Sequence, residues 1–487
     1  MDKRALPRLE QIKKVHVIGV CGTLMGAFAA YLRRRGIETV GSDQNVYPPM
    51  SEVLRDAGVT LYSGYRAENL AASGSPPDLV VIGNVISASN VEARAAIDGG
   101  YAYCSLPEAM EKLFLPKTRN IVVSGTHGKT TTSTMMAHTL VRNGRDPSYF
   151  IGGVSKDLPH SFHVAGIEDG RPYVLEGDEY DTAFWDKVPK FNHYLPDDVV
   201  LTSVEYDHAD IYPDFAAVVR AFEGLVARIR PGGRLIACFD YSTVRELAAK
   251  ATVPVISYGS EGCLGARYTP GRVRVENEWT RFDVLDGGRV VDELIIAVPG
   301  NHNVLNALAV WIECRELGLA APEIASALRC FQGVKRRQEV RGEVGGVLVM
   351  DDFAHHPTAV RETLRALRLR YPERRLMAVF EPRSATSRRK VFQADYVQAF
   401  TQGDAVFVST PYDQSRIPES DQFSSAQLVQ DLHSNQVTAF LMDTVDAGVQ
   451  QVAEFSRAGD LVAVLSNGGF EGFIPKLLET LRSRVTG

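Results

Sequence analysis

The sequence predicts an α/β protein made of three domains in series. Short apolar runs that end in polar or glycine-rich loops alternate with longer helical patterns along almost the whole chain. This alternation is typical of parallel sheets covered by helices. The 487 residues also exceed what one hydrophobic core usually spans, which is about 250–300 residues. We therefore expect three α/β units, the first of them Rossmann-like.

The first unit opens with a βαβ pattern. An apolar strand from Val15 leads through a glycine loop into a helix over about 25–35, and a second strand ends at Asp43. Proline and polar residues near Pro116 indicate a linker, after which another strand, glycine loop and helix begin. The predicted domains are residues 1–116, 117–331 and 332–487.

The composition is that of an ordinary globular enzyme. Hydrophobic residues make up 45% and charged residues 23% of the chain, and the formal net charge is -6. This balance excludes the general basic surface of a protein that binds nucleic acid or an acidic membrane. The apolar stretch 15–32 is broken by glycines and followed by arginines, which favours a nucleotide fold over a signal sequence. The six dispersed cysteines lack metal-ligand spacing and indicate reduced thiols in a cytoplasmic protein.

The strongest local signal is the segment Ser124–Thr132, SGTHGKTTT, between a predicted strand and a predicted helix. Its glycines let backbone N–H groups face an anion, and the helix N-terminus adds a positive dipole end. Lys129 supplies a charge for phosphate and Thr130 a hydroxyl for magnesium. The spacing is GxxGKT, shorter than the common phosphate loop, and the alternative is an ordinary strand-to-helix turn.

Two acidic motifs follow predicted strands further along the chain. They are Glu176–Asp181, EGDEYD, and Glu205–Asp210, EYDHAD. Carboxylates and a neutral imidazole at strand ends are the groups that a magnesium-phosphate site requires. Either motif alone would be interpreted as a solvated loop. Their position after a phosphate loop favours metal binding.

Three weaker patterns complete the set of candidates. The first loop, from Gly19 to Gly26, has the spacing GxxGxxxG instead of the GxGxxG of dinucleotide sites, and Asp43 can hold a hydroxyl-bearing group or be a plain loop residue. The segment 301–306 can read an adenine edge or merely cap a helix. The segments 333–337 and 351–357 bring cations, carboxylates and two histidines together, or form a charged surface.

The order of these motifs resembles the Mur ligase family over essentially the whole chain: GTHGKTTT, EGDEYD, YDHAD, NHNVLNALA, FQGVKRR and DDFAHHP. The resemblance implies a UDP-sugar domain, a central P-loop ATPase domain and a C-terminal domain that closes on ATP and the incoming amine. It implies an enzyme that uses ATP and Mg²⁺ to form an amide bond. We expect a monomer or weak homo-oligomer.

The resemblance also implies roles for individual residues. The expected ATP-binding residues are Gly125, Thr126, His127, Gly128, Lys129, Thr130, Thr131, Asn303, Asn306, Arg337 and Asp352. The expected metal ligands are Thr130, Glu176 and His208, and the expected UDP-sugar contacts are Gly19, Cys21, Gly22, Thr23, Asp43 and Asn84. The expected peptide contacts are His355, His356, Arg383, Ser384 and Thr386. The predicted catalytic residues are Lys129, Glu176, His208, Arg337 and His355.

Within the family, GVCGTLMG, EGDEYDTAFWDKVPKF and DDFAHHPTAV are similar to members that act in peptidoglycan recycling. Those members join UDP-N-acetylmuramate to the murein tripeptide L-Ala-γ-D-Glu-meso-diaminopimelate through an acyl phosphate. The alternative is the L-alanine-adding type, which tends to carry a GxGGxGM loop and an EADESD motif that this chain lacks. A nicotinamide oxidoreductase would leave the phosphate loop unexplained, and a non-catalytic regulator would not need Glu176 and His208.

Three points stay open at the level of sequence. Relatives often carry a carbamylated lysine fifteen positions after the metal histidine, where this chain has Glu223. We hypothesise that Glu223 supplies that negative charge directly. The base that deprotonates the amine is unassigned, with His355 and His356 as candidates, and Cys21 is either reactive or inert.

Overall fold

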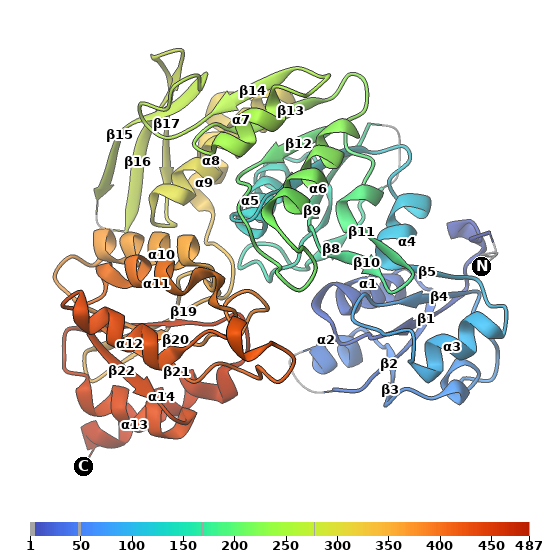
Figure 1. Cartoon of the computed structure of the whole chain (residues 1–487). Coiled ribbons are helices and arrows are strands. Elements are labelled where there is room, and N and C mark those ends of the chain that lie inside the picture. Colours follow the sequence, from blue (N-terminus) through green and yellow to red (C-terminus); the bar gives the residue numbers. More distant parts are fainter. Residues whose placement is uncertain (1–4, 47–49, 167–169, 277, 487) are drawn as a thin grey trace.

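The protein is built around three separate sheets, one in each of three domains (Figure 1). The computed structural model describes residues 5–46, 50–166, 170–276 and 278–486. The predicted α/β class and three-domain architecture are confirmed, whereas the residues at which one domain gives way to the next stay a prediction. No helix within the described residues is long and apolar enough to cross a membrane.

The first sheet has five parallel strands in the order β3-β2-β1-β4-β5. Ile18 at the end of β1 pairs with Ser42 and with Ile82, so the loops that follow these strands meet at one edge of the sheet. The strands are β1 Lys14–Ile18, β2 Glu38–Asp43, β3 Thr60–Ser63, β4 Leu79–Ile82 and β5 Tyr103–Ser105; the helices are α1 Thr23–Arg34, α2 Met50–Asp56, α3 Val91–Asp98 and α4 Leu106–Leu113.

The central sheet has ten strands, β17-β16-β15-β14-β13-β12-β6-β9-β7-β8, and an antiparallel arm formed by β15 to β17. Ser124 at the end of β6 pairs with Leu201 of β12 and with Gly177 of β9, so the predicted phosphate and acidic loops leave the sheet together. The first six strands are β6 Arg119–Ser124, β7 Ser148–Phe150, β8 Phe162–His163, β9 Pro172–Gly177, β12 Asp198–Leu201 and β13 Arg234–Cys238. The others are β14 Val255–Tyr258, β15 Tyr268–Glu276, β16 Trp279–Asp286 and β17 Arg289–Ile296, with the separate hairpin β10 Asp181–Ala183 and β11 Asp186–Pro189. The helices are α5 Lys129–Arg142, α6 Phe215–Ala227, α7 Ser242–Ala248, α8 Asn301–Glu316 and α9 Ala321–Cys330.

The third sheet has six strands in the order β18-β19-β23-β20-β21-β22, all parallel except for β18. Buried apolar side chains cover both of its faces, as expected for a sheet with helices on either side. The strands are β18 Glu339–Val344, β19 Val347–Asp352, β20 Arg375–Phe380, β21 Ala405–Ser409, β22 Thr438–Met442 and β23 Asp460–Leu465. The helices are α10 Pro357–Arg370, α11 Gln393–Ala399, α12 Ser425–Ser434, α13 Val445–Phe455 and α14 Phe473–Thr486.

The first and central domains share a core. Phe162 of β8 is fully buried and meets the rings of Phe28 and Tyr31 on α1, at 5.5 and 5.0 Å between centroids, and of Phe114. The hydrophobic cluster around these rings is continuous from the first sheet to α6 and α7. These two domains are therefore fixed to one another by apolar packing.

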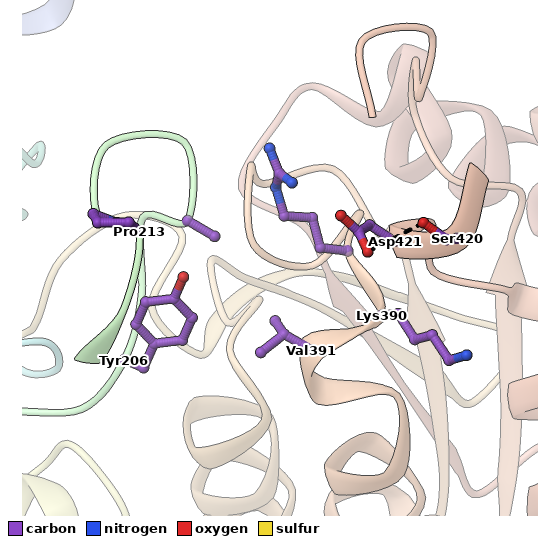
Figure 2. A pocket seen from close by; sticks show the side chains of 8 residues that line it. Tyr206, Pro213, Lys390, Val391, Ser420 and Asp421 are labelled. Carbon is purple, nitrogen blue, oxygen red and sulfur yellow. Dashed lines mark hydrogen bonds between the residues drawn. The ribbon is translucent and has the colours of Figure 1, made fainter. Parts of the chain in front are cut away.

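The central and third domains face each other across a pocket of about 410 Å³. Tyr206 and Pro213 lie on the central-domain side, and Val391 and Asp421 lie on the third-domain side (Figure 2). The third domain has clusters of its own, which contain no residue of the other two. Polar contacts and this pocket therefore make up much of the boundary between the central and third domains.

Phe162→Ala is expected to lower the free energy of unfolding by about 3–5 kcal/mol, because it removes a buried aromatic ring and leaves a cavity between two domains. Urea denaturation measures the change. Phe215→Ala is the matched control, since Phe215 is 40% exposed at the start of α6, and it should cost less than about 1 kcal/mol. Equal effects of the two substitutions would contradict the shared core.

Candidate active site

The phosphate loop joins β6 to α5 and depends on two glycines. Gly125 and Gly128 have φ values of 137° and 83°, which strongly favour glycine. A Cβ atom on Gly125 would lie 2.2 Å from the Thr202 hydroxyl, and one on Gly128 would lie 2.8 Å from the Asn306 amide oxygen. The loop backbone is thus packed closely against these residues, and the N–H groups of Thr126 and His127 donate to the carbonyl and the hydroxyl of Ser203 at 3.0 and 2.9 Å.

Lys129 begins α5 and is buried, at 8% exposure. Its ammonium donates to the Glu179 carboxylate at 2.9 and 3.1 Å and to the Gly125 carbonyl at 2.7 Å. Burial by itself lowers the pKa of Lys129, but the carboxylates of Glu179 and Asp178 outweigh it and raise the pKa overall. The loop therefore keeps a full positive charge where phosphate is expected.

Thr130 and Glu176 form a compact pair of oxygen donors. The Thr130 hydroxyl donates to the Glu176 carboxylate at 2.6 Å, and the Gly152 N–H donates to the other carboxylate oxygen at 2.6 Å. Burial and the neighbouring Asp178 raise the pKa of Glu176. A cation in addition to Lys129 is favourable beside these carboxylates. The Thr130 hydroxyl and the Glu176 carboxylate are groups of the kind that bind Mg²⁺.

His208 approaches the same cluster from the loop after β12. Its Nε2 lies 3.0 Å from a Glu179 oxygen, and its backbone has a φ of 56°, a strained value for a residue with a side chain. Burial would raise the pKa of Glu179, but Lys129 and His208 lower it to about 2. Glu179 is thus an anion that joins two of the predicted site residues.

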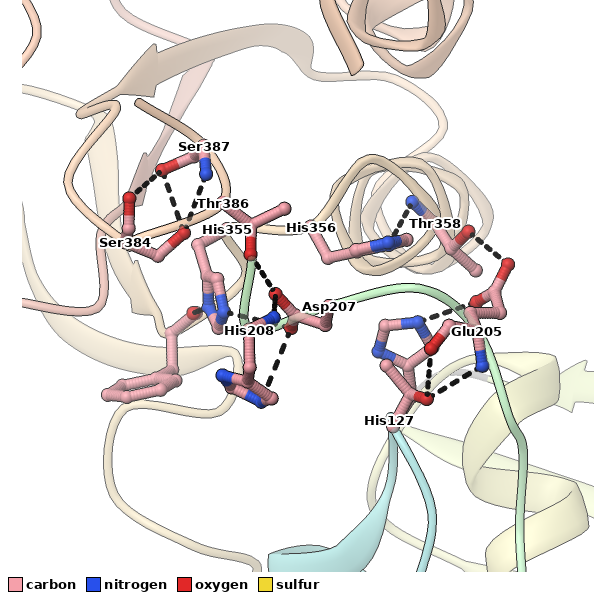
Figure 3. A network of polar contacts seen from close by, with 12 residues as sticks. His127, Glu205, Asp207, His208, His355, His356, Thr358, Ser384, Thr386 and Ser387 are labelled. Carbon is pink, nitrogen blue, oxygen red and sulfur yellow. Dashed lines mark hydrogen bonds and ion pairs between the residues drawn. The ribbon is translucent and has the colours of Figure 1, made fainter. Parts of the chain in front are cut away.

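Asp207, the residue before His208, connects this cluster to the third domain (Figure 3). The Thr386 hydroxyl donates to Asp207 at 2.6 Å, and His355 Nε2 lies 3.7 Å from the other carboxylate oxygen. Burial would raise the pKa of Asp207, but its bond with His355 and the charge of His208 hold it well below its usual range. Two predicted peptide-binding residues therefore lie beside the predicted metal histidine.

Glu205 makes a second connection, also drawn in Figure 3, and the Tyr206 backbone adds a contact beside it. Glu205 pairs with His127 Nε2 at 2.6 Å and accepts from the Thr358 hydroxyl at 3.0 Å. His356 Nδ1 accepts from the Thr358 N–H at the start of α10, and its Nε2 donates to the Tyr206 carbonyl, both at 3.2 Å. Burial lowers the pKa of His356 to about 4, so the ring is neutral at pH 7.

Three predicted ATP-binding residues lie at the start of α8 and at the end of β19. Asn303 donates to the Pro299 carbonyl at 2.7 Å, and Asn306 donates to the Asn303 amide oxygen at 3.1 Å. Asp352 accepts from the N–H groups of Gln338 and Ala354 at 2.8 and 2.7 Å. These groups are ordered by bonds within the protein.

Arg337 lies in a strained segment between the central and third domains. Its guanidinium stacks on the Phe353 ring at 4.8 Å. The residues on either side, Arg336 and Gln338, have φ values of 59° and 50°. Backbone conformations of this kind cost about 1–3 kcal/mol each and cluster at functional sites.

The remaining predicted positions contact their own domains. Arg383 pairs with Glu381 at 3.2 Å, and its guanidinium lies over the Tyr412 ring. The Ser384 hydroxyl donates to Ser387 at 2.9 Å. Thr126 accepts from the Glu205 N–H at 2.8 Å. Thr131 is half-buried in the first turn of α5.

The predicted UDP-sugar residues gather at the carboxyl edge of the first sheet. The Asp43 carboxylate accepts from the Cys21 N–H at 2.9 Å, which ties the end of β2 to the loop after β1. Burial and the Asp43 charge raise the pKa of Cys21 to about 11, so its thiol stays protonated and weakly nucleophilic at neutral pH. The other predicted residues at this edge are Gly19, Gly22, Thr23 and Asn84.

The hypothesis that Glu223 supplies negative charge to the metal site stays a prediction. Glu223 lies on α6 with its side chain 43% exposed, and it pairs with Lys250 of α7 at 3.1 Å. The buried carboxylate that contacts both Lys129 and His208 is Glu179.

Sequence reasoning also missed Asp207 and the roles of Glu179 and Glu205. All three lie within the acidic motifs, but only the first glutamate of one and the histidine of the other were singled out. The available signal was the density of carboxylates after two strands, β9 and β12, which flank the strand of the phosphate loop; such a density needs cations nearby. Tyr206 contributes a backbone carbonyl, which no sequence pattern indicates.

Comparison with protein families matches almost the whole chain. Residues 14–118 match the Mur ligase family catalytic domain, residues 123–313 the Mur ligase middle domain, and residues 336–468 the Mur ligase glutamate ligase domain. The fold and phosphate site, together with these matches, define an ATP-dependent peptide ligase. The chain belongs to the Mur ligase family.

Individual relatives agree with this assignment. UDP-N-acetylmuramate--L-alanyl-gamma-D-glutamyl-meso-2,6-diaminoheptandioate ligase from Escherichia coli (strain K12) is 36% identical over 97% of this chain and 99% of its own length. UDP-N-acetylmuramate--L-alanine ligase from Kineococcus radiotolerans is 35% identical over 99% of this chain and 98% of its own. The crystal structure of a murein peptide ligase from Psychrobacter arcticus 273-4 superposes with a TM-score of 0.72 at 31% identity, covering 96% of this chain and 99% of that one.

The neutral His356 predicts a pH dependence of stability. Its pKa is about 4 in the folded protein and about 6.5 when unfolded, so the unfolded chain binds the proton more readily. The contribution of the neutral His356 to the free energy of unfolding is fully present above pH 6.5 and is lost as the pH falls toward 4. His356→Asn keeps an acceptor for the Thr358 N–H, and it should reduce the loss in unfolding free energy between pH 7 and 5 by about 2 kcal/mol. Identical losses for both proteins in urea denaturation would contradict this account.

Proposed function

We propose that this enzyme joins the lactyl carboxylate of UDP-N-acetylmuramate to the amine of L-Ala-γ-D-Glu-meso-diaminopimelate. The reaction consumes ATP, requires Mg²⁺, and proceeds through an acyl phosphate in the bacterial cytoplasm, where it serves peptidoglycan recycling. The observation that carries the proposal is the joined site. The Glu179 carboxylate contacts both Lys129 of the phosphate loop and His208, and Asp207, the residue before His208, contacts Thr386 of the third domain. The likeness to the Escherichia coli ligase supports the choice of substrates.

The protein groups act mainly by neutralising charge and aligning reactants. A carboxylate that attacks the terminal phosphate of ATP meets electrostatic repulsion, which Lys129 and Arg337 reduce. The peptide amine then displaces phosphate from the acyl phosphate to form the amide. His355 and Thr386 hold this amine near Asp207, at the boundary of the central and third domains. Asn303, Asn306 and Asp352 hold the nucleoside.

The residues present suit a magnesium ion. Thr130, Glu176 and His208 would hold it, since a hydroxyl, a buried carboxylate with a raised pKa and an imidazole lie in one carboxylate-rich cluster. When bound, Mg²⁺ would neutralise part of the negative charge of the phosphate groups. Glu179 keeps Lys129 and His208 in position for this arrangement.

Lys129→Ala should lower the ligation rate by about two to three orders of magnitude, because one fixed charge at the transferred phosphate is lost. Circular dichroism checks that the variant is folded. Near-normal turnover would refute the assignment.

Glu223→Gln tests whether Glu223 supplies negative charge to the metal site. Since Glu223 pairs with Lys250 near the surface, its removal should change turnover by less than about twofold. A large loss of turnover would support Glu223 as a site residue.

The substrate is tested by ADP release with ATP, Mg²⁺ and UDP-N-acetylmuramate, comparing the tripeptide with free L-alanine as the amine. Turnover with the tripeptide alone is expected. Turnover with L-alanine alone would assign the chain to the biosynthetic type represented by the Kineococcus relative. No turnover with either amine would reject the proposed carboxylate substrate.

A further inference from the structure

The pocket between the central and third domains has no part in the phosphate chemistry described above (Figure 2). Its central-domain wall comes from the segment after β12. Its third-domain wall comes from two segments, one directly before α11 and the other before α12. The lining residues are Tyr206, Ala209, Pro213, Arg389, Lys390, Val391, Ser420 and Asp421.

The pocket adjoins the position proposed for the reacting amine. The Ala209 N–H donates to the Thr386 hydroxyl at 3.3 Å, and this hydroxyl donates to Asp207. The Arg389 N–H donates to the Thr386 carbonyl at 3.0 Å. Since a residue spans at most about 3.3–3.6 Å, Arg389 lies within about 11 Å of Thr386 along the chain. A three-residue peptide with its amine at Thr386 can therefore reach the pocket with its far end.

Arg389 lacks a partner for its side chain among the described residues. Its Nε is enclosed and makes no hydrogen bond. The neighbouring Arg388 differs, because its guanidinium donates to the carbonyls of Ser384 and Asp413. An enclosed charged donor without an acceptor is costly. The Arg389 Nε is therefore available to an anionic group of a ligand.

The opposite charge is present in the same pocket. Asp421 is exposed, and its carboxylate accepts a 3.5 Å hydrogen bond from the hydroxyl of the neighbouring Ser420. Tyr206 donates its hydroxyl to the Tyr212 carbonyl, so its ring serves as an apolar wall opposite Val391. Cation, anion and apolar wall together suit a ligand end with a carboxylate and an ammonium on a short hydrocarbon chain.

The two third-domain walls are held in a fixed register. The backbone of Arg389 pairs with that of Gln422 as an antiparallel bridge. The Phe423 N–H and the Gln414 amide both donate to the Arg388 carbonyl, at 3.0 and 2.8 Å. The positions of Arg389 and Asp421 are thus set before a ligand arrives, which lowers the entropy cost of binding.

We propose that this pocket selects the third residue of the peptide, with Arg389 receiving the distal carboxylate of diaminopimelate and Asp421 its distal ammonium. The proposal rests on the proposed function. Both distal groups sit on one carbon of that residue, which matches a pocket that offers both signs of charge. Arg389 is then a specificity-determining residue.

The test compares kcat/KM for two tripeptides that end in meso-diaminopimelate or in L-lysine, the second of which lacks the distal carboxylate. The native enzyme should prefer the diaminopimelate peptide by about tenfold to a hundredfold, the effect of one charged hydrogen bond. Arg389→Gln should remove most of this preference by raising KM for that peptide, and it should change kcat/KM for the lysine peptide by less than about twofold. An undiminished preference, or an equal loss with both peptides, would overturn the proposal.

Arg388→Gln is the matched control, because Arg388 is satisfied by backbone carbonyls, and it should retain the preference. Asp421→Asn should lower kcat/KM for both tripeptides, since both carry the distal ammonium. It should leave kcat/KM unchanged for a peptide that ends in 2-aminoheptanedioate, which lacks that ammonium. Equal weakening of all three would overturn the role of Asp421. Turnover of either tripeptide by the native enzyme upholds the ligase function by itself, so a failure at Arg389 is distinguishable from a failure of that function.

Discussion

The Glu179 carboxylate lies between the Lys129 ammonium and the His208 imidazole, with only 2% exposure. Removing either partner would leave a buried charge poorly compensated, which is strongly destabilising. The three residues come from the loops after β9, β6 and β12, so one anion fixes the relative positions of all three loops. Phosphate then approaches a lysine that is already charged and already oriented, and little reorganisation is left for the reaction.

Three consecutive residues extend this order into the third domain. Glu205, Tyr206 and Asp207 contact Thr358, His356 and Thr386, while their neighbour His208 contacts Glu179. A shift of the third domain therefore acts directly on the loop that carries the predicted metal histidine. The strained residues Arg336 and Gln338 lie where the chain passes into this domain and flank Arg337. The position of the third domain and the position of Arg337, the predicted catalytic arginine, are thus linked.

Much of the fold was predictable because local signals were strong. Helix α5 follows the phosphate loop and β2 ends at Asp43, both as predicted, because glycine loops and apolar runs give clear signals there. The antiparallel arm β15 to β17 was not predicted, because its polar outward faces weaken the apolar signal. The site was predictable to the level of motifs. The pairing of Glu179 with Lys129 and His208 required the sheet order, which sets the loops side by side and which periodicity does not encode.

The continuous core of the first two domains has a consequence for how such chains can be divided or recombined. Cutting between these domains would expose the rings around Phe162 to water, so neither half is suited to independent expression. The apolar clusters of the third domain contain only its own residues, and polar side chains and a pocket lie between it and the central domain. The third domain is therefore the part best suited to replacement by that of a relative. Such a chimaera would combine a different surface for the proposed amine substrate with the same phosphate site, and no apolar cluster would be exposed.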